Sequence, residues 1–302
     1  MGGRRRQHDQ LRQRFFQAGA DSLASLGLIE AANRYVCPQC VRAFLPQAVE
    51  ARALTLEHAP SRRLGGKAIT LTCVDCNPQA GSRLEAALMR ERQLENFLRG
   101  KPGRWRGKLI TEDDIGASVT IVAEADVVKI AGLPRHSNPD AHRTAFDYFE
   151  RHVGRSDWRF KVQLPGYDRR RAAIGHLRTA YIAAFAKLGY AFLLNPLGAR
   201  LRSQIANPER EDMTGFLATT RLPVDPSARA LAICDAPFSC LAVQMGRRVV
   251  ILPWPPSGVD PYDAVQHTGD ALGKMHGKAM EWPTGMELVL DKLVAAQQAR
   301  LG

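Results

Sequence analysis

Apolar residues recur at helical spacing near the start of the chain and then give way to a shorter pattern. Through residues 9–33 this spacing predicts one or two amphipathic helices. Residues 55–58 and 68–72 predict two strands, joined by a loop that contains Gly65 and Gly66, and the helical spacing returns from Ser82 to Arg99, before Gly100. The expected order is helix, strand, strand, helix. The apolar positions of the first segment are Leu11, Phe15, Phe16, Leu23, Leu26 and Ile29.

A segment without periodicity follows, rich in glycine and basic residues from Gly100 to Lys108, and we place a domain boundary there. Beyond it, strand-like runs alternate with helical ones. Asn138 and Pro139 predict the start of a helix that continues to His152, and a second helix is expected from Arg170 to Gly189. The strand-like runs are 118–123, 158–164, 230–234 and 249–252.

These patterns predict an α+β protein of more than one domain. We expect an N-terminal helical segment over residues 1–35, a small domain over 36–100, a basic linker over 101–110 and a C-terminal mixed α/β domain over 111–302. No window reaches ~18 uninterrupted apolar residues, and the basic N-terminus has no apolar signal core. We therefore expect a soluble, cytoplasmic protein without a membrane partner.

The net charge of +12 is concentrated in the first third of the chain. Residues 1–110 hold 19 Lys and Arg against 9 Asp and Glu, whereas residues 111–302 hold 23 against 21. A polyanion would meet the first third first, and nucleic acid is the commonest such partner. A charge that serves solubility alone is the alternative. The near-neutral remainder argues against a second large DNA-binding face.

Four of the six cysteines form two C-x-x-C pairs, Cys37 with Cys40 and Cys73 with Cys76. In a chain without an export signal, two such pairs are typical of a zinc site with four sulfur ligands. A redox dithiol is the alternative. Four thiolates leave no open coordination position, so we expect this Zn²⁺ to be structural.

Three further residues lie between the two cysteine pairs or directly after the second one. Glu57 and His58 lie between the two pairs, and Asn77 follows the last cysteine directly. This arrangement, with Gly65-Gly66-Lys67 between the two motifs, resembles the zinc-containing members of the HNH (ββα-metal) endonuclease family over residues 36–99. The resemblance implies a ββα-metal fold, and activity as an endonuclease that hydrolyses DNA phosphodiester bonds by a one-metal mechanism.

The same residues suit that chemistry. The oxygens of Glu57 and Asn77 are suitable ligands for a catalytic Mg²⁺ or Mn²⁺, and His58 suits a general base. Many family members carry a third ligand about nine residues after the asparagine, where this chain has Ala86. The alternative is a non-catalytic zinc-ribbon protein that binds nucleic acid or acts as an adaptor.

Basic residues around this site are candidates for phosphate contacts. Arg62, Arg63 and Lys67 are expected in the loop between the strands, and Arg83 and Arg90 on the following helix. A solvated helix face explains the helix residues equally well. Trp105, between two arginines, can stack on a base or sugar, with a flexible basic linker as the simpler account.

The role of the C-terminal domain stays open. Recognition of a DNA structure, a protein partner, a homodimer contact and a regulatory ligand are all compatible with its sequence. Three of its histidines, at 136, 142 and 152, have no partner at ligand spacing, so no second metal site is expected there.

Overall fold

The chain divides into two compact units. Unit 1 comprises Met1–Ala86 and Arg170–Gly302, and unit 2 comprises Ala87–Arg169. This division differs from the predicted one because the chain leaves unit 1 and returns to it. The computed structural model describes residues 2–27, 33–111, 114–124, 127–136, 138–152, 154, 161–164, 166–211, 213–220, 224–236, 238–268 and 275–301.

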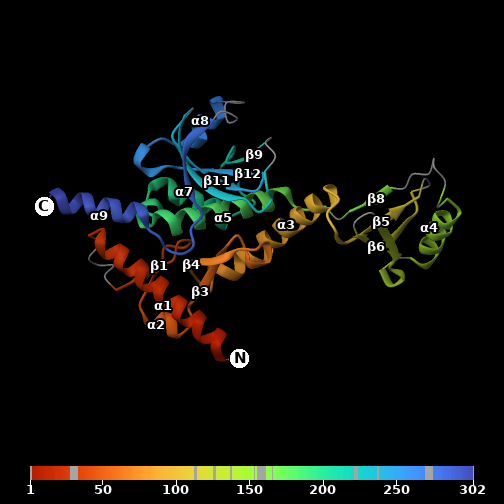
Figure 1. The fold of residues 1–302 in the computed structure, drawn as a ribbon, viewed down its shortest axis with the longest axis horizontal. Helices are drawn as coiled ribbons and strands as arrows, with labels where there is room; N and C mark the ends of the chain where they lie inside the picture. The colour runs from red at the N-terminus through yellow and green to blue at the C-terminus, as the bar shows by residue number, and fades with distance from the viewer. Residues whose placement is uncertain are drawn as a thin grey trace. The chain divides into compact units, whose positions relative to one another are not determined.

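The N-terminal part of unit 1 has the predicted order of helix, strand, strand and helix (Figure 1). Two short strands and a short helix are added between the first helix and the hairpin. The elements are α1 Gly2–Ser25, β1 Tyr35–Val36, β2 Ala43–Phe44, α2 Gln47–Glu50, β3 Leu54–Ala59, the 3-10 helix η2 Arg62–Leu64, β4 Lys67–Cys73 and α3 Cys76–Leu98.

The glycine pair makes the turn of the β3–β4 hairpin possible. Gly65 has a φ of +76°, which residues with a side chain rarely adopt. A Cβ on Gly66 would lie 1.5 Å from the carbonyl oxygen of Pro60, so only glycine fits there. The two strands pair antiparallel from Leu54 opposite Cys73, as the sequence predicts.

The C-terminal part of unit 1 contains a five-stranded antiparallel sheet in the order β13-β10-β11-β12-β9. Its strands are β9 Leu217–Thr219, β10 Arg229–Ala236, β11 Cys240–Met245, β12 Arg248–Leu252 and β13 His276–Glu281. The helices are α5 Arg169–Leu188, α6 Tyr190–Leu193, α7 Pro196–Ala206, the 3-10 helix η4 Pro255–Ser257, α8 Pro261–Thr268 and α9 Val289–Leu301.

Helix α5 is the centre of unit 1 and lies between this sheet and the β3–β4 hairpin (Figure 1). Its residues from Leu177 to Leu188 are almost all buried, which is expected of a helix that is apolar on every side. They share one core cluster with Ile69 of the hairpin and Leu231 of the sheet. The predicted stop is confirmed: the helix ends before Gly189, whose φ is +100°.

The opposite face of the hairpin packs against α1. Phe15 and Phe16 of this helix form a second core cluster with Leu54, Leu71 and Cys73. The hairpin is therefore held between α1 and α5, two helices that lie far apart in the sequence. Of the helix segment predicted over residues 9–33, residues 28–32, which include Ile29, lie outside the described residues.

Unit 2 is a four-stranded antiparallel sheet, in the order β7-β6-β5-β8, with one helix packed on it. The core joins Leu109, Val119 and Ile121 of the sheet to Phe146 and Phe149 of the helix. The elements are β5 Gly103–Ile110, β6 Gly116–Glu124, β7 Val127–Gly132, the 3-10 helix η3 Pro134–His136, α4 Pro139–His152 and β8 Lys161–Gln163.

The segment predicted as a basic linker is instead strand β5. The physical reason is an alternation of side chains that its glycine and arginine content obscured: Trp105 and Leu109 are buried, and the residues beside them are exposed. The indole nitrogen of Trp105 donates to the backbone oxygen of Gln93 at 3.2 Å. Because this ring is 8% exposed and packs on Phe97, it does not present a stacking surface to solvent.

Most other predicted elements are confirmed. The helix predicted from Asn138 is α4, and the strand-like runs correspond to β6, β8, β10 and β12. Residues 158–160 of the second run lie outside the described residues. None of the helices in the described ranges has the length and apolar content that crossing a bilayer requires.

Candidate metal centre

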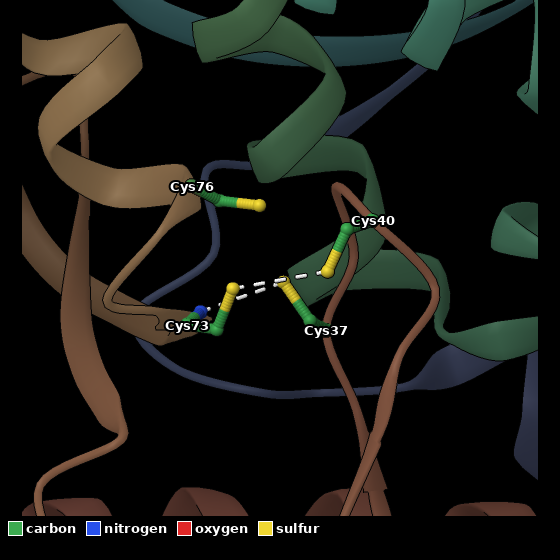
Figure 2. A group of neighbouring side chains, drawn as sticks. All are labelled: Cys37, Cys40, Cys73 and Cys76. Carbon is green, nitrogen blue, oxygen red and sulfur yellow. Dashed lines mark hydrogen bonds between the residues drawn. The ribbon is translucent and has the colours of Figure 1, made fainter.

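The four cysteines of the two C-x-x-C pairs meet at one point of unit 1. Cys37 follows β1, Cys73 ends β4 and Cys76 begins α3, so three elements bring them together. All four sulfur atoms lie within 4.8 Å of one another, and Figure 2 shows the side chains pointing toward a common centre. Cys37 and Cys73 are buried, whereas Cys40 is exposed. The cluster can hold a metal ion.

The backbone around Cys37 forms a tight turn that turns the first pair toward the second. The amide of Cys37 donates to the carbonyl of Arg42 at 2.9 Å, and the amide of Val41 donates to the carbonyl of Cys37 at 2.9 Å. Val41 has a φ of +60° in this turn. The amide of Cys73 donates to the sulfur of Cys37 at 3.4 Å, which joins the two pairs directly (Figure 2).

The electrostatics of the cluster fit a cation. A hydrogen bond from the Cys76 thiol lowers the pKa of Cys37 to about 5. The pKa of Cys76 is raised, first by the same hydrogen bond, then by burial, and then by the negative charge of the Cys37 thiolate, which disfavours a second thiolate beside it. A divalent ion would remove that repulsion, since metal binding favours the thiolate form of its ligands.

Arg42 adds positive charge at the rim of the cluster. Its guanidinium donates to the sulfur of Cys40 at 3.5 Å and to the sulfur of Cys73 at 3.3 Å, and it also pairs with Asp75. Hydrogen bonds to ligating sulfur atoms are a common outer shell of metal centres. Nothing in the local sequence pattern identified Arg42 for this position.

Glu57, the predicted acidic ligand, is 3% exposed and engaged on one oxygen. Its Oε2 accepts from the hydroxyl of Thr72 at 2.8 Å and from Nη2 of Arg178 at 2.9 Å. With its amide oxygen facing Arg178, Gln39 accepts from Nε at 2.6 Å and from Nη2 at 3.0 Å. Arg178 of α5 therefore joins the first cysteine turn to β3.

Asn77, the residue after Cys76, contacts the same strand. Its Nδ2 donates to the hydroxyl of Thr55 at 2.8 Å. Thr55 lies two residues before Glu57, so the two side chains share one face of β3. Thr55 is also the cross-strand partner of Thr72, which donates to Glu57. Glu57 and Asn77 are thus brought to the same pair of threonines.

His58 has different surroundings from Glu57. It is half-buried, and burial lowers its pKa, with further lowering by Arg62 and His8 and an opposing effect from Glu57. His8 belongs to α1, whereas the partners of Glu57 belong to β4 and α5. Adjacent residues of a strand point to opposite faces, and the register of the hairpin shifts at this step.

The predicted phosphate contacts are exposed. Arg62 and Arg63 lie in η2, within the loop between the strands as predicted, whereas Lys67 is the first residue of β4 and not a loop residue. Arg83 and Arg90 lie on α3 as predicted. No protein-family model, curated protein or solved structure matches the chain.

Sequence reasoning missed the residues that anchor the centre from α5. The hydroxyl of Tyr181 donates to the carbonyl of Pro38 at 2.7 Å, inside the first C-x-x-C turn. Arg178 lies one turn earlier on the same helix and contacts Gln39 and Glu57. The spacing of three residues places both side chains on one helix face, but no local pattern links Tyr181 to Pro38, which lies 143 residues earlier.

Proposed function

We propose that the protein is a metal-dependent endonuclease of the HNH type that hydrolyses DNA phosphodiester bonds, with a structural Zn²⁺ at the four cysteines. The observation that carries the proposal is the position of the cysteine cluster. It lies where β4 passes into α3, between the strand that holds Glu57 and the helix that holds Asn77. The strand, strand, helix order around it is the one that the family resemblance implies.

The oxygens of the two proposed ligands suit a hard cation. Nδ2 of Asn77 is used by Thr55, which leaves Oδ1 as the acceptor of this amide. Both hydrogen bonds of Glu57 fall on Oε2, so Oε1 is the oxygen for a cation. A bound Mg²⁺ or Mn²⁺ would neutralise the charge that develops on the phosphate during hydrolysis.

In this proposal His58 acts as the general base. This role requires its imidazole to reach the ion held by Glu57 and Asn77, although its neighbour His8 belongs to α1 and the partners of Glu57 belong to β4 and α5. The imidazole takes a proton from water, the water oxygen forms a bond to phosphorus, and the bond to the 3′ oxygen breaks, with that oxygen taking a proton from solvent. The ends are then a 5′-phosphate and a 3′-hydroxyl. Arg62, Arg63 and Lys67, exposed beside the end of β3, would hold the DNA backbone without selecting a sequence.

A specific contact favours the second candidate, a non-catalytic zinc-ribbon protein that binds nucleic acid or acts as an adaptor. The carboxylate of Glu57 is already neutralised by Arg178 inside the protein. If this ion pair is purely structural, Glu57 is not a metal ligand and the chain binds DNA without cutting it. The two candidates therefore differ in whether Glu57 and His58 matter for chemistry.

Plasmid cleavage separates them. Supercoiled plasmid is incubated with the full chain and Mg²⁺ or Mn²⁺, using wild type, His58→Ala, Asn77→Ala and His276→Ala. His276 is an exposed residue of β13 and serves as the matched control. The proposal expects metal-dependent nicking that is lost in the first two variants and kept in the third. DNA binding by wild type without any cutting would support the adaptor instead.

A further inference from the structure

The strand that replaces the predicted linker carries a row of cations. Arg104, Arg106 and Lys108 alternate along β5 with the buried Trp105 and Leu109. Alternation places the three cations on one face of the sheet, about 7 Å apart along the strand. All three are exposed, and none forms an ion pair with a residue of the described ranges.

Neighbouring strands extend this row across the sheet. Cross-strand pairs share a face, so Ser118 lies beside Lys108 and Thr120 beside Arg106. Gln163 of β8 pairs with Lys108, and Lys161, two residues earlier, is on the same face. The outward face of the unit 2 sheet is therefore formed by Arg104, Arg106, Lys108, Ile110, Gly116, Ser118, Thr120, Val122, Lys129, Ala131, Lys161 and Gln163, with Glu124 at its end.

Charge in unit 2 is segregated rather than high overall. The unit holds 15 Lys and Arg against 12 Asp and Glu. Five of the cations lie on the outward face, where Glu124 is the one acid among the described residues and is paired with Lys129 at 2.8 Å. The helix α4, on the other face of the sheet, carries three exposed acids, Asp140, Asp147 and Glu150, beside two exposed arginines, Arg143 and Arg151, so its charges nearly balance. The outward face is therefore basic although the unit is not.

The outward face also has a hollow of a size to admit a phosphate group. It has a volume of about 380 Å³ and is open to solvent. Arg106 and Lys108 line it together with Ser118, His136 and Gln163. Two cations, a hydroxyl, an imidazole and an amide are groups that bind phosphate oxygens.

The residue types on this face indicate which kind of nucleic acid it suits. Proteins that bind single strands stack bases on aromatic side chains, and the described residues of the outward face include none. The aromatic rings Trp105, Phe97 and Phe146 point into the core. Cations without stacking partners suit the phosphates of a duplex, and the major groove of DNA, unlike that of RNA, is wide enough for strands.

We infer that the outward face of the unit 2 sheet binds the phosphate backbone of duplex DNA. The residues of this surface are different from the loop residues near His58. If the proposed nuclease activity holds, duplex DNA is its substrate. The inference does not require cleavage, because a DNA-binding face acts the same way in a nuclease and in an adaptor.

Binding of a fluorescent 25-base-pair DNA duplex to the full chain tests the inference. The measurement is made without added Mg²⁺ or Mn²⁺, so that no cleavage occurs. The variant Arg104→Ala/Arg106→Ala is compared with Arg143→Ala/Arg151→Ala, which removes two exposed cations from α4. We expect about tenfold weaker binding for the first variant and a salt dependence lower by about 1.8 in logarithmic slope, because each lost phosphate contact contributes about 0.9.

The control variant should bind within about twofold of wild type. Equal losses in the two variants would overturn the inference, because net charge alone would then explain binding. Stronger competition by duplex RNA or single-stranded DNA of the same length would overturn the choice of duplex DNA. Thermal unfolding of both variants shows that each is folded. Plasmid cleavage is measured separately. If the protein does not cleave plasmid, the difference in duplex binding between the two variants still tests the inference.

Discussion

Nη2 of Arg178 lies 2.9 Å from Oε2 of Glu57, across 121 residues of sequence, and the two side chains are 12% and 3% exposed. The pair joins α5 to β3 in the interior of unit 1. It explains how a carboxylate can be buried in this hairpin, since a buried charge is tolerated only with a partner. The two candidate functions also assign this pair different roles: in the nuclease Glu57 additionally binds a metal ion, whereas in the adaptor the pair is purely structural.

Removing Arg178 should therefore be costly. Arg178→Ala leaves the Glu57 carboxylate buried and unpaired, and we expect a loss of about 3–5 kcal/mol in the free energy of unfolding. Arg171→Ala removes an exposed ion pair with Glu209 from the same helix and should cost about 1 kcal/mol or less. Urea unfolding measures both. Similar small losses would show that the Arg178 pair is not buried in solution.

Asp291 gives a prediction for the pH dependence of stability. This carboxylate is 1% exposed and accepts from the amides of Tyr190 and Ala191, both at 2.7 Å, and from Ser22. Burial raises its pKa above the ordinary value of 3.8, against an opposing effect of these hydrogen bonds. The folded state therefore binds a proton at Asp291 more tightly than the unfolded state does. This preference stabilises the fold fully at pH values below the pKa of the unfolded state, and the stabilisation is lost as the pH rises through the pKa of the folded state.

The comparison is between wild type and Asp291→Asn, which does not titrate. The difference in unfolding free energy should move in favour of wild type as pH is lowered from 7 to 4. Chemical unfolding at several pH values measures it. A difference that moves toward the variant on acidification would mean that the hydrogen bonds outweigh burial.

Gly189 separates α5 from α6 in a conformation that only glycine adopts readily, with φ +100° and ψ −157°. A Cβ there would lie 2.0 Å from Oδ2 of Asp291. We expect Gly189→Ala to cost about 3 kcal/mol or more. Gly258→Ala, at a φ of +68° with open space around it, should cost about 1 kcal/mol. Thermal unfolding distinguishes the two, and equal losses would contradict the steric argument.

Local patterns in the sequence predicted the elements whose determinants are close together. The two C-x-x-C pairs predicted the cysteine cluster, since thiols at this spacing can share one ion, and the glycine pair predicted the turn between β3 and β4. Asn138 and Pro139 predicted the start of α4. In each case one physical constraint acts within a few residues of where it is encoded.

Two features were not predicted from the sequence: the packing of α5 on the hairpin and the strand β5. Arg178 could not be assigned to Glu57, because nothing local says that α5 returns to cover the hairpin. The same return makes unit 1 discontinuous. In β5, the alternation of Trp105 and Leu109 with charged residues was present, but glycines at 103 and 107 and the arginines favoured a linker instead.

Both candidate functions require a structural metal ion in the cysteine cluster, and metal content measures this directly. Full-length protein, purified without chelators, is analysed for zinc by mass spectrometry beside Cys37→Ser, Cys76→Ser and the control Cys240→Ser, a buried cysteine of β11. We expect about one zinc per chain in wild type and the control and a loss in the other two variants. Absence of zinc from wild type, or its retention in both cluster variants, would contradict the account.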